Sequence, residues 1–303
     1  MAILNVKDIF PWNKMEKRTV DGQSVVFIPK IYVMNTALAS GKYAGRPAYF
    51  ISGTKDDGYH CHPAFMQSGA EAPTGIEIGV YGAGKDSSGK ATSTSWSNTW
   101  TSTSYNDIRT AAHTRNVAGG TDEQMGWHAY NIYEHHLIAR LMLIEYESAD
   151  LPTLLGGNRK ATDVTYHGIE KVWGGNGWCE WLDGLAVTET TGSNAKCFIN
   201  VFDMYGYVES INTPFAPPGK GWPVDFHREK GAKYDLGDLF IASETSEKES
   251  GGSCGDYQDL QVTGAGSFHT AHGTFDSSGP FSLSSDTLDT TIRYLGFRLA
   301  RYC

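Results

Sequence analysis

The stretch that decides the fold runs from Gly168 to Gly184 and reads GIEKVWGGNGWCEWLDG. It places three tryptophans, Trp173, Trp178 and Trp181, among glycines that let the backbone turn tightly. Large aromatic side chains gathered in this way are more typical of a core than of a ligand platform. We therefore interpret the three tryptophans as structural scaffold.

The composition agrees with a globular, β-rich protein whose core is aromatic. Of the 303 residues, 40% are hydrophobic, only 19% are charged and 35 are glycine, which excludes a disordered chain or a coiled coil. The net charge of −9, without a basic patch, predicts no binding of nucleic acid. No run of 18 apolar residues occurs, so we expect no membrane insertion, and the start lacks the apolar stretch of a signal peptide, which predicts synthesis in a cytoplasm.

The first part of the chain predicts strands. Residues 24–32, 48–52 and 76–81 are rich in β-branched and aromatic side chains. Pro29 lies within the first of these runs and predicts that this strand is at an edge or a bulge, because proline cannot donate a ladder hydrogen bond.

Two helices are predicted in the middle of the chain. Ser104 can cap the first, which runs to about Arg115. Thr121 and Gln124 form a capping-box pattern that predicts a second helix from there to about Tyr146, with the helical region ending around residues 151–158. Short strands and turns follow, and the last strand spans residues 294–301, so the fold class is α+β.

Two groups of residues suggest catalytic chemistry, and each has a simpler interpretation. His60 and His62 are two apart, so on one strand they could present two imidazoles to a zinc ion. Glu180 and Asp183 could form the carboxylate pair of a glycosidase. The simpler interpretations are a turn with a satisfied histidine and a packed aromatic core. We expect no catalytic residue, no metal and no cofactor, because no nucleophile elbow, phosphate loop or paired cysteines are present.

The C-terminal segment differs from the rest of the chain. Aromatic and hydrogen-bonding side chains lie there among Gly, Ser and Thr without the periodicity of a core, which is typical of a binding surface on irregular loops. The candidate ligand-binding residues are Tyr257, Asp259, His269, His272, Phe275, Asp276 and Phe281.

Several motifs, taken in order along the chain, resemble those of phage tail and receptor-binding proteins of the C-type lectin fold. The run VVFIPKIY at residues 25–32 resembles an IPKFY strand, and DGYHCHPAF at residues 57–65 resembles a DGF-HPAF element. The end of the long helix, LMLIEY at residues 141–146, and the tryptophan stretch quoted above are similar to further elements of that group. GGS at residues 251–253 and the closing LGFRL at residues 295–299 resemble the frame of the binding region.

The resemblance implies a particular architecture and role. A β-rich region, residues 1–100, would pack on or extend a C-type lectin-like domain of two helices and an irregular short-stranded sheet, residues 101–303, with its binding region at 251–303. Gly296 and Arg298 would belong to the scaffold with the tryptophans. The chain would be a phage or prophage tail receptor-binding protein, a homotrimer in the virion at a tail fibre or tail tip, contacting other tail proteins and a bacterial surface receptor that is a protein or a glycan.

The same frame occurs in variable proteins of diversity-generating retroelements, such as the major tropism determinant of a phage, and in formylglycine-generating enzymes. Residues 254–286 are rich in the side chains that adenine-directed substitution of asparagine codons can produce, so this region is a candidate for diversification. The calcium-binding EPN and WND tripeptides of sugar-binding lectins are absent, as are the paired active-site cysteines of the enzymes. The alternatives are a structural tail-fibre or baseplate connector, and an oxidase or metal-dependent enzyme on the same fold.

Overall fold

A computed structural model describes most of the chain. The described residues are 4–67, 70–148, 150–156, 163–175, 178–188, 197–202, 208–215, 219–226, 242–247, 258–260, 265–270, 283–287 and 289–303. They form an α+β arrangement of helices and mostly antiparallel strands, which confirms the expected fold class. No helix within these residues is long and apolar enough to cross a membrane.

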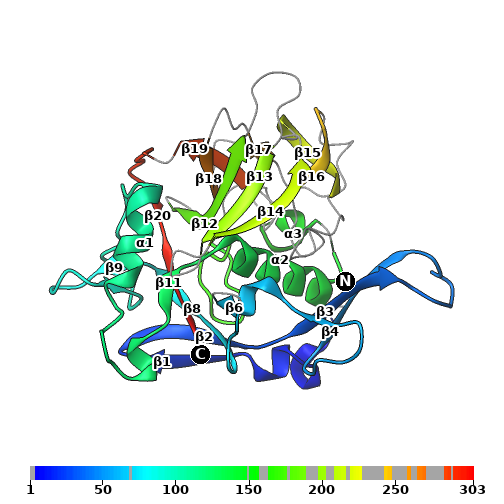
Figure 1. The fold of residues 1–303 in the computed structure, drawn as a ribbon, viewed down its shortest axis with the longest axis horizontal. Coiled ribbons are helices and arrows are strands. Elements are labelled where there is room, and N and C mark those ends of the chain that lie inside the picture. Colours follow the sequence, from blue (N-terminus) through cyan, green and yellow to red (C-terminus); the bar gives the residue numbers. More distant parts are fainter. Residues whose placement is uncertain are drawn as a thin grey trace.

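A five-stranded antiparallel sheet forms the base of the molecule (Figure 1). Its strands in spatial order are β1 (Glu16–Val20), β2 (Gln23–Pro29), β8 (Gly75–Gly82), β21 (Arg298–Tyr302) and β11 (Trp127–Ala129). The closing strand β21 therefore lies between a strand from the first third of the chain and one from its middle. Both faces of β8 and β21 are buried almost throughout, because side chains from helices and loops cover them.

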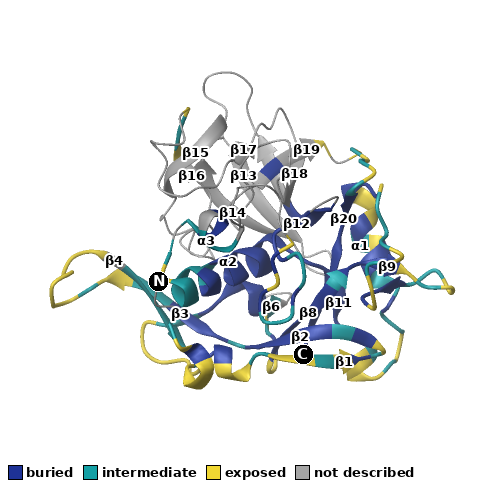
Figure 2. Ribbon diagram, turned by 180° about the vertical axis from the view of Figure 1, so that it is seen from behind, coloured by how far each residue is buried: buried dark blue, intermediate teal, exposed yellow. Residues whose placement is uncertain are grey.

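The helices pack beside this sheet, and one of them supplies much of the core. They are α1 (Tyr105–His113), α2 (Ile132–Tyr146) and the short α3 (Leu151–Gly156). Ile108, Ala111 and Ala112 of α1 are buried together, as its periodicity indicates. The first eight residues of α2 are all buried, as are Leu141 and Met142, and Figure 2 shows this helix largely in the buried colour between the two sheets.

A nine-stranded sheet lies on the other side of α2 (Figure 1). Its order is β14-β13-β12-β18-β19-β17-β15-β16, with β20 (Leu295–Gly296) paired to β12 beside this path. The bounds are β12 (Cys179–Thr188), β13 (Cys197–Phe202), β14 (Val208–Phe215), β15 (Gly219–Phe226), β16 (Ala242–Ser246), β17 (Gln258–Leu260), β18 (Ala265–Thr270) and β19 (Leu283–Thr287).

Small sheets and single turns complete the described structure. The strands are β3 (Tyr32–Ala37), β4 (Pro47–Ser52), β5 (His60–Cys61), β6 (Met66–Gln67), β7 (Ala70–Glu71), β9 (Gly84–Lys85) and β10 (Ala91–Thr92). The 3-10 turns are η1 (Val6–Asp8), η2 (Trp12–Lys14), η3 (Pro63–Phe65) and η4 (Asp122–Gln124).

The prediction of one helix from residue 121 to residue 146 is wrong at its start. The Thr121 and Gln124 pair does form a capping box, but it closes only the single turn η4. Gly126 then takes a φ of +84°, which breaks a helix, and β11 follows as a partner of β21. The long helix begins only after a second capping box, formed by Asn131 and Glu134.

A smaller expectation also differs from the structure. The strand that contains Pro29 is not at an edge, because β2 lies between β1 and β8. Pro29 is tolerated because it is the last residue of β2. Strand β1 begins only opposite Phe27, so no β1 residue is paired with Pro29. The two predicted helices are followed by a short third one, α3 at residues 151–156, which lies within the range where the helical region was expected to end.

Candidate functional site

The structure brings two of the predicted binding residues into one row of the nine-stranded sheet. Asp259 of β17 and His269 of β18 are both register partners of Ser284 in β19, which lies between them. The row continues from His269 to Trp181 of β12 and from Asp259 to Lys220 of β15. These positions are strands, so the expectation of irregular loops is wrong here, because polar and small residues are held by ladder hydrogen bonds. Tyr257, His272, Phe275, Asp276 and Phe281 lie outside the described residues.

Strand β12 joins this row to a fully buried ion pair. Arg298 and Glu180 are each completely buried, and the Arg298 Nε lies 3.2 and 3.0 Å from the two carboxylate oxygens of Glu180. Burial raises the pKa of Glu180, whereas the Arg298 charge acts in the opposite direction. The other guanidinium nitrogens of Arg298 donate to four backbone carbonyls, those of Gly79, Val80, Glu170 and Lys171. One side chain thus connects β8, β12, β21 and the loop before Trp173.

The three tryptophans are buried, and Trp178 contacts this ion pair through its indole N–H, which donates to Glu180 at 3.4 Å. Trp173, Trp178 and Trp181 are each no more than 2% exposed. The Trp178 ring lies against Gly82 and Gly296, where a Cβ atom would overlap the indole, so these two glycines are required by close packing. The Trp181 indole N–H donates to the Thr103 carbonyl at 2.8 Å and so fixes β12 to the segment before α1.

A second buried carboxylate follows on the same strand. The Tyr105 hydroxyl donates to Asp183 at 2.6 Å, and the Arg109 Nε lies 3.4 Å from the other Asp183 oxygen. Burial raises the pKa of Asp183 to about 6, although Arg109 and Tyr105 favour its charged form. These contacts hold β12 against α1, so Glu180 and Asp183 are both engaged with the frame rather than arranged as an acid–base pair.

The start of α2 carries a third buried polar group. Asn131 accepts a hydrogen bond from the Glu134 N–H at 2.9 Å, and Glu134 in return accepts one from the Asn131 N–H at 2.8 Å. The other Glu134 oxygen lies 2.9 Å from Nε2 of His128 in β11. Burial opposes the charge of His128, but Glu134 and the Gly126 carbonyl outweigh it and raise the pKa of His128.

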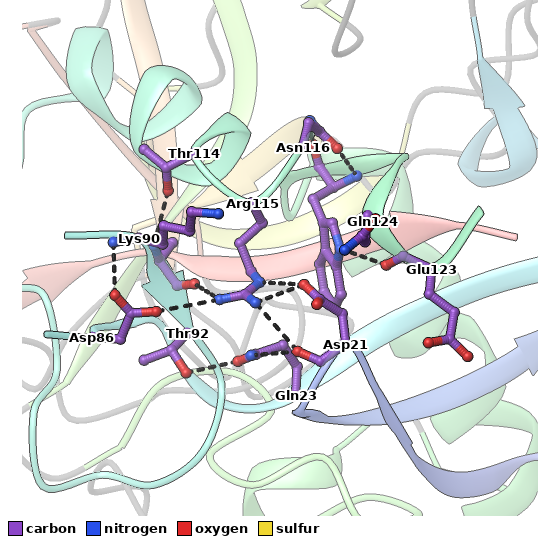
Figure 3. Close-up of polar contacts among 12 residues, drawn as sticks. Asp21, Gln23, Asp86, Lys90, Thr92, Thr114, Arg115, Asn116, Glu123 and Gln124 are labelled. Carbon is purple, nitrogen blue, oxygen red and sulfur yellow. Dashed lines mark hydrogen bonds and ion pairs between the residues drawn. The ribbon is translucent and has the colours of Figure 1, made fainter. Parts of the chain in front are cut away.

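Arg115 lies two residues after α1 and binds the β1–β2 turn and strand β10 (Figure 3). Its Nε and Nη2 donate to Asp21 in the β1–β2 turn at 2.9 and 2.6 Å, and its Nη1 donates to the Ala91 carbonyl of β10 at 3.0 Å. Asp86 lies 3.6 Å away as a further charge partner. This cluster fastens two hairpins to α1, which is a structural role.

The proposed pair of imidazoles does not lie on one strand. Strand β5 ends at Cys61, and His62 is the N-cap of η3, where its Nδ1 accepts a hydrogen bond from the Ala64 N–H at 3.1 Å. Within the described part of the chain no three His, Cys, Asp or Glu side chains are grouped as a metal site would require. Cys61, Cys179 and Cys303 are free thiols, and burial raises the pKa of Cys179, which disfavours a reactive thiolate.

The sequence did not reveal Ser284, which joins the two predicted residues. Ser284 is buried between Asp259 and His269 in the register, and only strand pairing across a long separation identifies it. Comparison of the chain with family models and with curated protein sequences found no match.

Proposed function

We propose that this chain is a phage or prophage tail receptor-binding protein whose C-terminal part has the C-type lectin fold. The observation that carries the proposal is the row that contains Asp259, Ser284 and His269, attached through β12 to a frame of buried tryptophans and the Arg298 ion pair. A binding surface can tolerate substitution when the fold is fixed elsewhere.

The finer parts of the proposal rest on the sequence motifs. The motifs quoted at residues 25–32, 168–184 and 295–299 contribute to β2, β12 and β20–β21. Strand β20 pairs with β12, and Arg298 of β21 pairs with Glu180 of β12. In the proposed role the chain is a homotrimer at a tail fibre or tail tip and binds a protein or glycan receptor on a bacterium, and residues 254–286 are diversified by a retroelement. Multivalent contact would convert weak single contacts into strong adsorption.

Adsorption of the purified full-length protein to a panel of bacterial strains tests this function. The double variant Asp259→Ala/His269→Ala is expected to lose most adsorption, and the variant that also changes Tyr257, His272 and Phe275 to alanine is expected to lose all of it. Glu244→Ala is the matched control, because Glu244 is exposed in β16 of the same sheet but lies outside the row. Unchanged melting temperatures show that the variants are folded.

Two results would count against the proposal. Full adsorption by the quintuple variant places the receptor contact on another surface, and failure of the parent protein to adsorb to any strain favours a structural connector. An enzyme on the same fold would be indicated only by turnover that adsorption does not accompany.

A further inference from the structure

The hairpin formed by β3 and β4 extends away from the body of the molecule as an arm. Its strands pair from Tyr32 opposite Ser52 to Ala37 opposite Pro47, and Leu38 continues the pairing with backbone hydrogen bonds to Gly45 and Arg46 of 2.8 and 2.9 Å. Figure 1 shows the arm projecting from one side, and Figure 2 shows its distal part in the exposed colour. At about 3.3 Å per residue, the part beyond Ala37 reaches roughly 15 Å outward.

The arm has support only at its base. Val33 is fully buried there, and the Arg140 guanidinium of α2 lies 3.6 Å from the centre of the Tyr49 ring. From residue 39 to residue 46 every residue is exposed. A two-stranded hairpin without a covering layer is only marginally stable in water, so a surface that covers the tip would stabilise it.

The charge of the arm is opposite to that of the whole chain. From Gly22 to Lys55 the sequence has no Asp or Glu, although the net charge of the protein is −9. Lys30 and Lys55 at the base both pair with Glu71, at 3.4 and 2.8 Å. At the tip, Lys42 and Arg46 flank the ring of Tyr43 at 5.3 and 5.4 Å, and Tyr43 is 50% exposed. The tip is thus a cationic surface centred on an exposed aromatic ring.

An acidic turn, η4, lies next to β11 in the chain and is the candidate acceptor for the tip of the arm. Asp122 and Glu123 form the first two residues of η4 and are both exposed. The turn is held in place because the Arg301 side chain donates to the Asp122 carbonyl at 3.0 Å and the Trp127 indole donates to the Glu123 carbonyl at 3.1 Å. Figure 3 shows the Glu123 side chain directed away from the Arg115 cluster. Its neighbour β11 lies on the side of the body away from the arm in Figure 1.

We propose that the arm of one copy of this chain docks on η4 of the next copy, with Lys42 and Arg46 against Asp122 and Glu123. A second copy is the partner that the charges favour, because the arm is cationic and the rest of the same chain is acidic. Arm and acceptor are different surfaces of the chain, so the contact is head-to-tail and gives a closed ring or an open chain of copies. The inference does not depend on receptor binding.

Charge reversal and its repair test the contact in the full-length protein. Sedimentation velocity is expected to show that the parent protein is oligomeric, and that Lys42→Glu/Arg46→Glu raises the dissociation constant at least about tenfold. The variant Asp122→Lys/Glu123→Lys is expected to dissociate to the same extent, and an equimolar mixture of the two variants, or all four changes in one chain, is expected to reassociate. Lys7→Glu/Lys14→Glu is the control, because it makes the same change in net charge at exposed residues outside the arm.

The result is decisive in either direction. A monomeric parent protein, or an oligomer that survives reversal of Lys42 and Arg46, shows that the arm does not join copies and leaves it for a partner of another kind. Dissociation by the arm variant without repair by the η4 variant shows that η4 is not the acceptor, which also overturns the proposal. Melting temperatures equal to that of the parent exclude unfolding as the cause of dissociation.

Discussion

Arg298 is a charged side chain with no exposure to solvent, and its partners are drawn from three separate parts of the chain. Replacement by methionine keeps much of the volume but leaves Glu180 buried without its cation and removes the guanidinium hydrogen bonds from four carbonyls. We therefore expect Arg298→Met to lower the free energy of unfolding by about 3 to 5 kcal/mol, measured by urea denaturation.

The matched control is Arg293→Met, because Arg293 is exposed five residues earlier in the same terminal segment. Its effect is expected to stay below about 0.5 kcal/mol. The double variant Glu180→Leu/Arg298→Met is expected to recover part of the loss but not all of it, since the two β8 carbonyls still lose their hydrogen bonds from the guanidinium. A loss similar to that of the control would contradict the central role of this ion pair.

Asp183 makes the free energy of unfolding depend on pH, and the sign of this dependence follows from the burial of its carboxylate. Burial raises its pKa in the folded protein to about 6, above its ordinary value of 3.8, so the folded state binds this proton more tightly than the unfolded state. The contribution of Asp183 to stability is complete below about pH 4 and is lost as the pH rises through about 6. We expect Asp183→Asn to remove this dependence, so that the difference in unfolding free energy between the variant and the parent changes between pH 4 and pH 7 in favour of the variant.

Urea denaturation across that pH range measures the effect, and the comparison with the parent cancels the other titrating groups. Asp57→Asn is the control, because Asp57 is exposed in the turn before β5. A constant difference between the Asp183 variant and the parent would show that this carboxylate does not titrate in the range.

At the scale of single residues, the sequence identified large buried groups better than their partners. The tryptophans were expected as scaffold because aromatic density is a local signal, whereas Arg298 was expected there only from the resemblance to a known family. The acceptors of Arg298 are separated from it by more than 100 residues, so no local pattern could show them. Asp183 was visible only as a possible carboxylate pair with Glu180.

At the scale of elements, the decisive difference is between two capping boxes ten residues apart. Thr121 and Gln124 match the pattern as well as Asn131 and Glu134 do, but only the second pair starts the long helix. The glycine at position 126 was the available signal against the earlier start. The strand β11 that follows it exists because β21 is its partner, and that pairing is not local.

Removing the two capping boxes is expected to lower the free energy of unfolding by different amounts. Asn131→Ala removes a buried cap of α2 and is expected to cost about 1 to 2 kcal/mol of unfolding free energy. Gln124→Ala removes a solvent-exposed hydrogen bond of 3.1 Å to the Thr121 N–H at the turn η4 and is expected to cost less than about 0.5 kcal/mol. Thermal unfolding followed by circular dichroism compares the two, and equal losses would mean that η4 is as important to the fold as the start of α2.

The nine-stranded sheet shows why the candidate site was expected on loops. Residues 258–260 and 265–270 are short and contain Gly, Ser, Asp and His, which have low strand propensity. Pairing with β12, β15 and β19 makes them strands, and such pairing is set by the surrounding sheet. Composition was enough to nominate Asp259 and His269 as candidates, but it could not predict that both pair with Ser284 in one row of the sheet.

At the scale of the whole molecule, the base sheet joins segments that are far apart in the sequence. Strands β1, β2 and β8 come from the first 100 residues, whereas β11 and β21 come from the remainder. The register places Ala300 of β21 opposite Ile78 of β8, and both are fully buried in the same core. Strands from the first 100 residues and from the rest of the chain thus share one sheet through backbone hydrogen bonds.

This arrangement predicts that residues 101–303 do not fold alone. Without β8, the strand β21 lacks one neighbour, and Arg298 loses the two β8 carbonyls that accept from its Nη1. A fragment of residues 101–303 is expected to show no cooperative unfolding transition, and addition of a fragment of residues 1–100 is expected to restore one, because the two pieces can rebuild the sheet. Differential scanning calorimetry measures both, with the intact chain as the reference. A cooperative transition in the isolated fragment 101–303 would show that the core around α2 and the nine-stranded sheet is sufficient by itself, and that the first region stabilises a structure already formed.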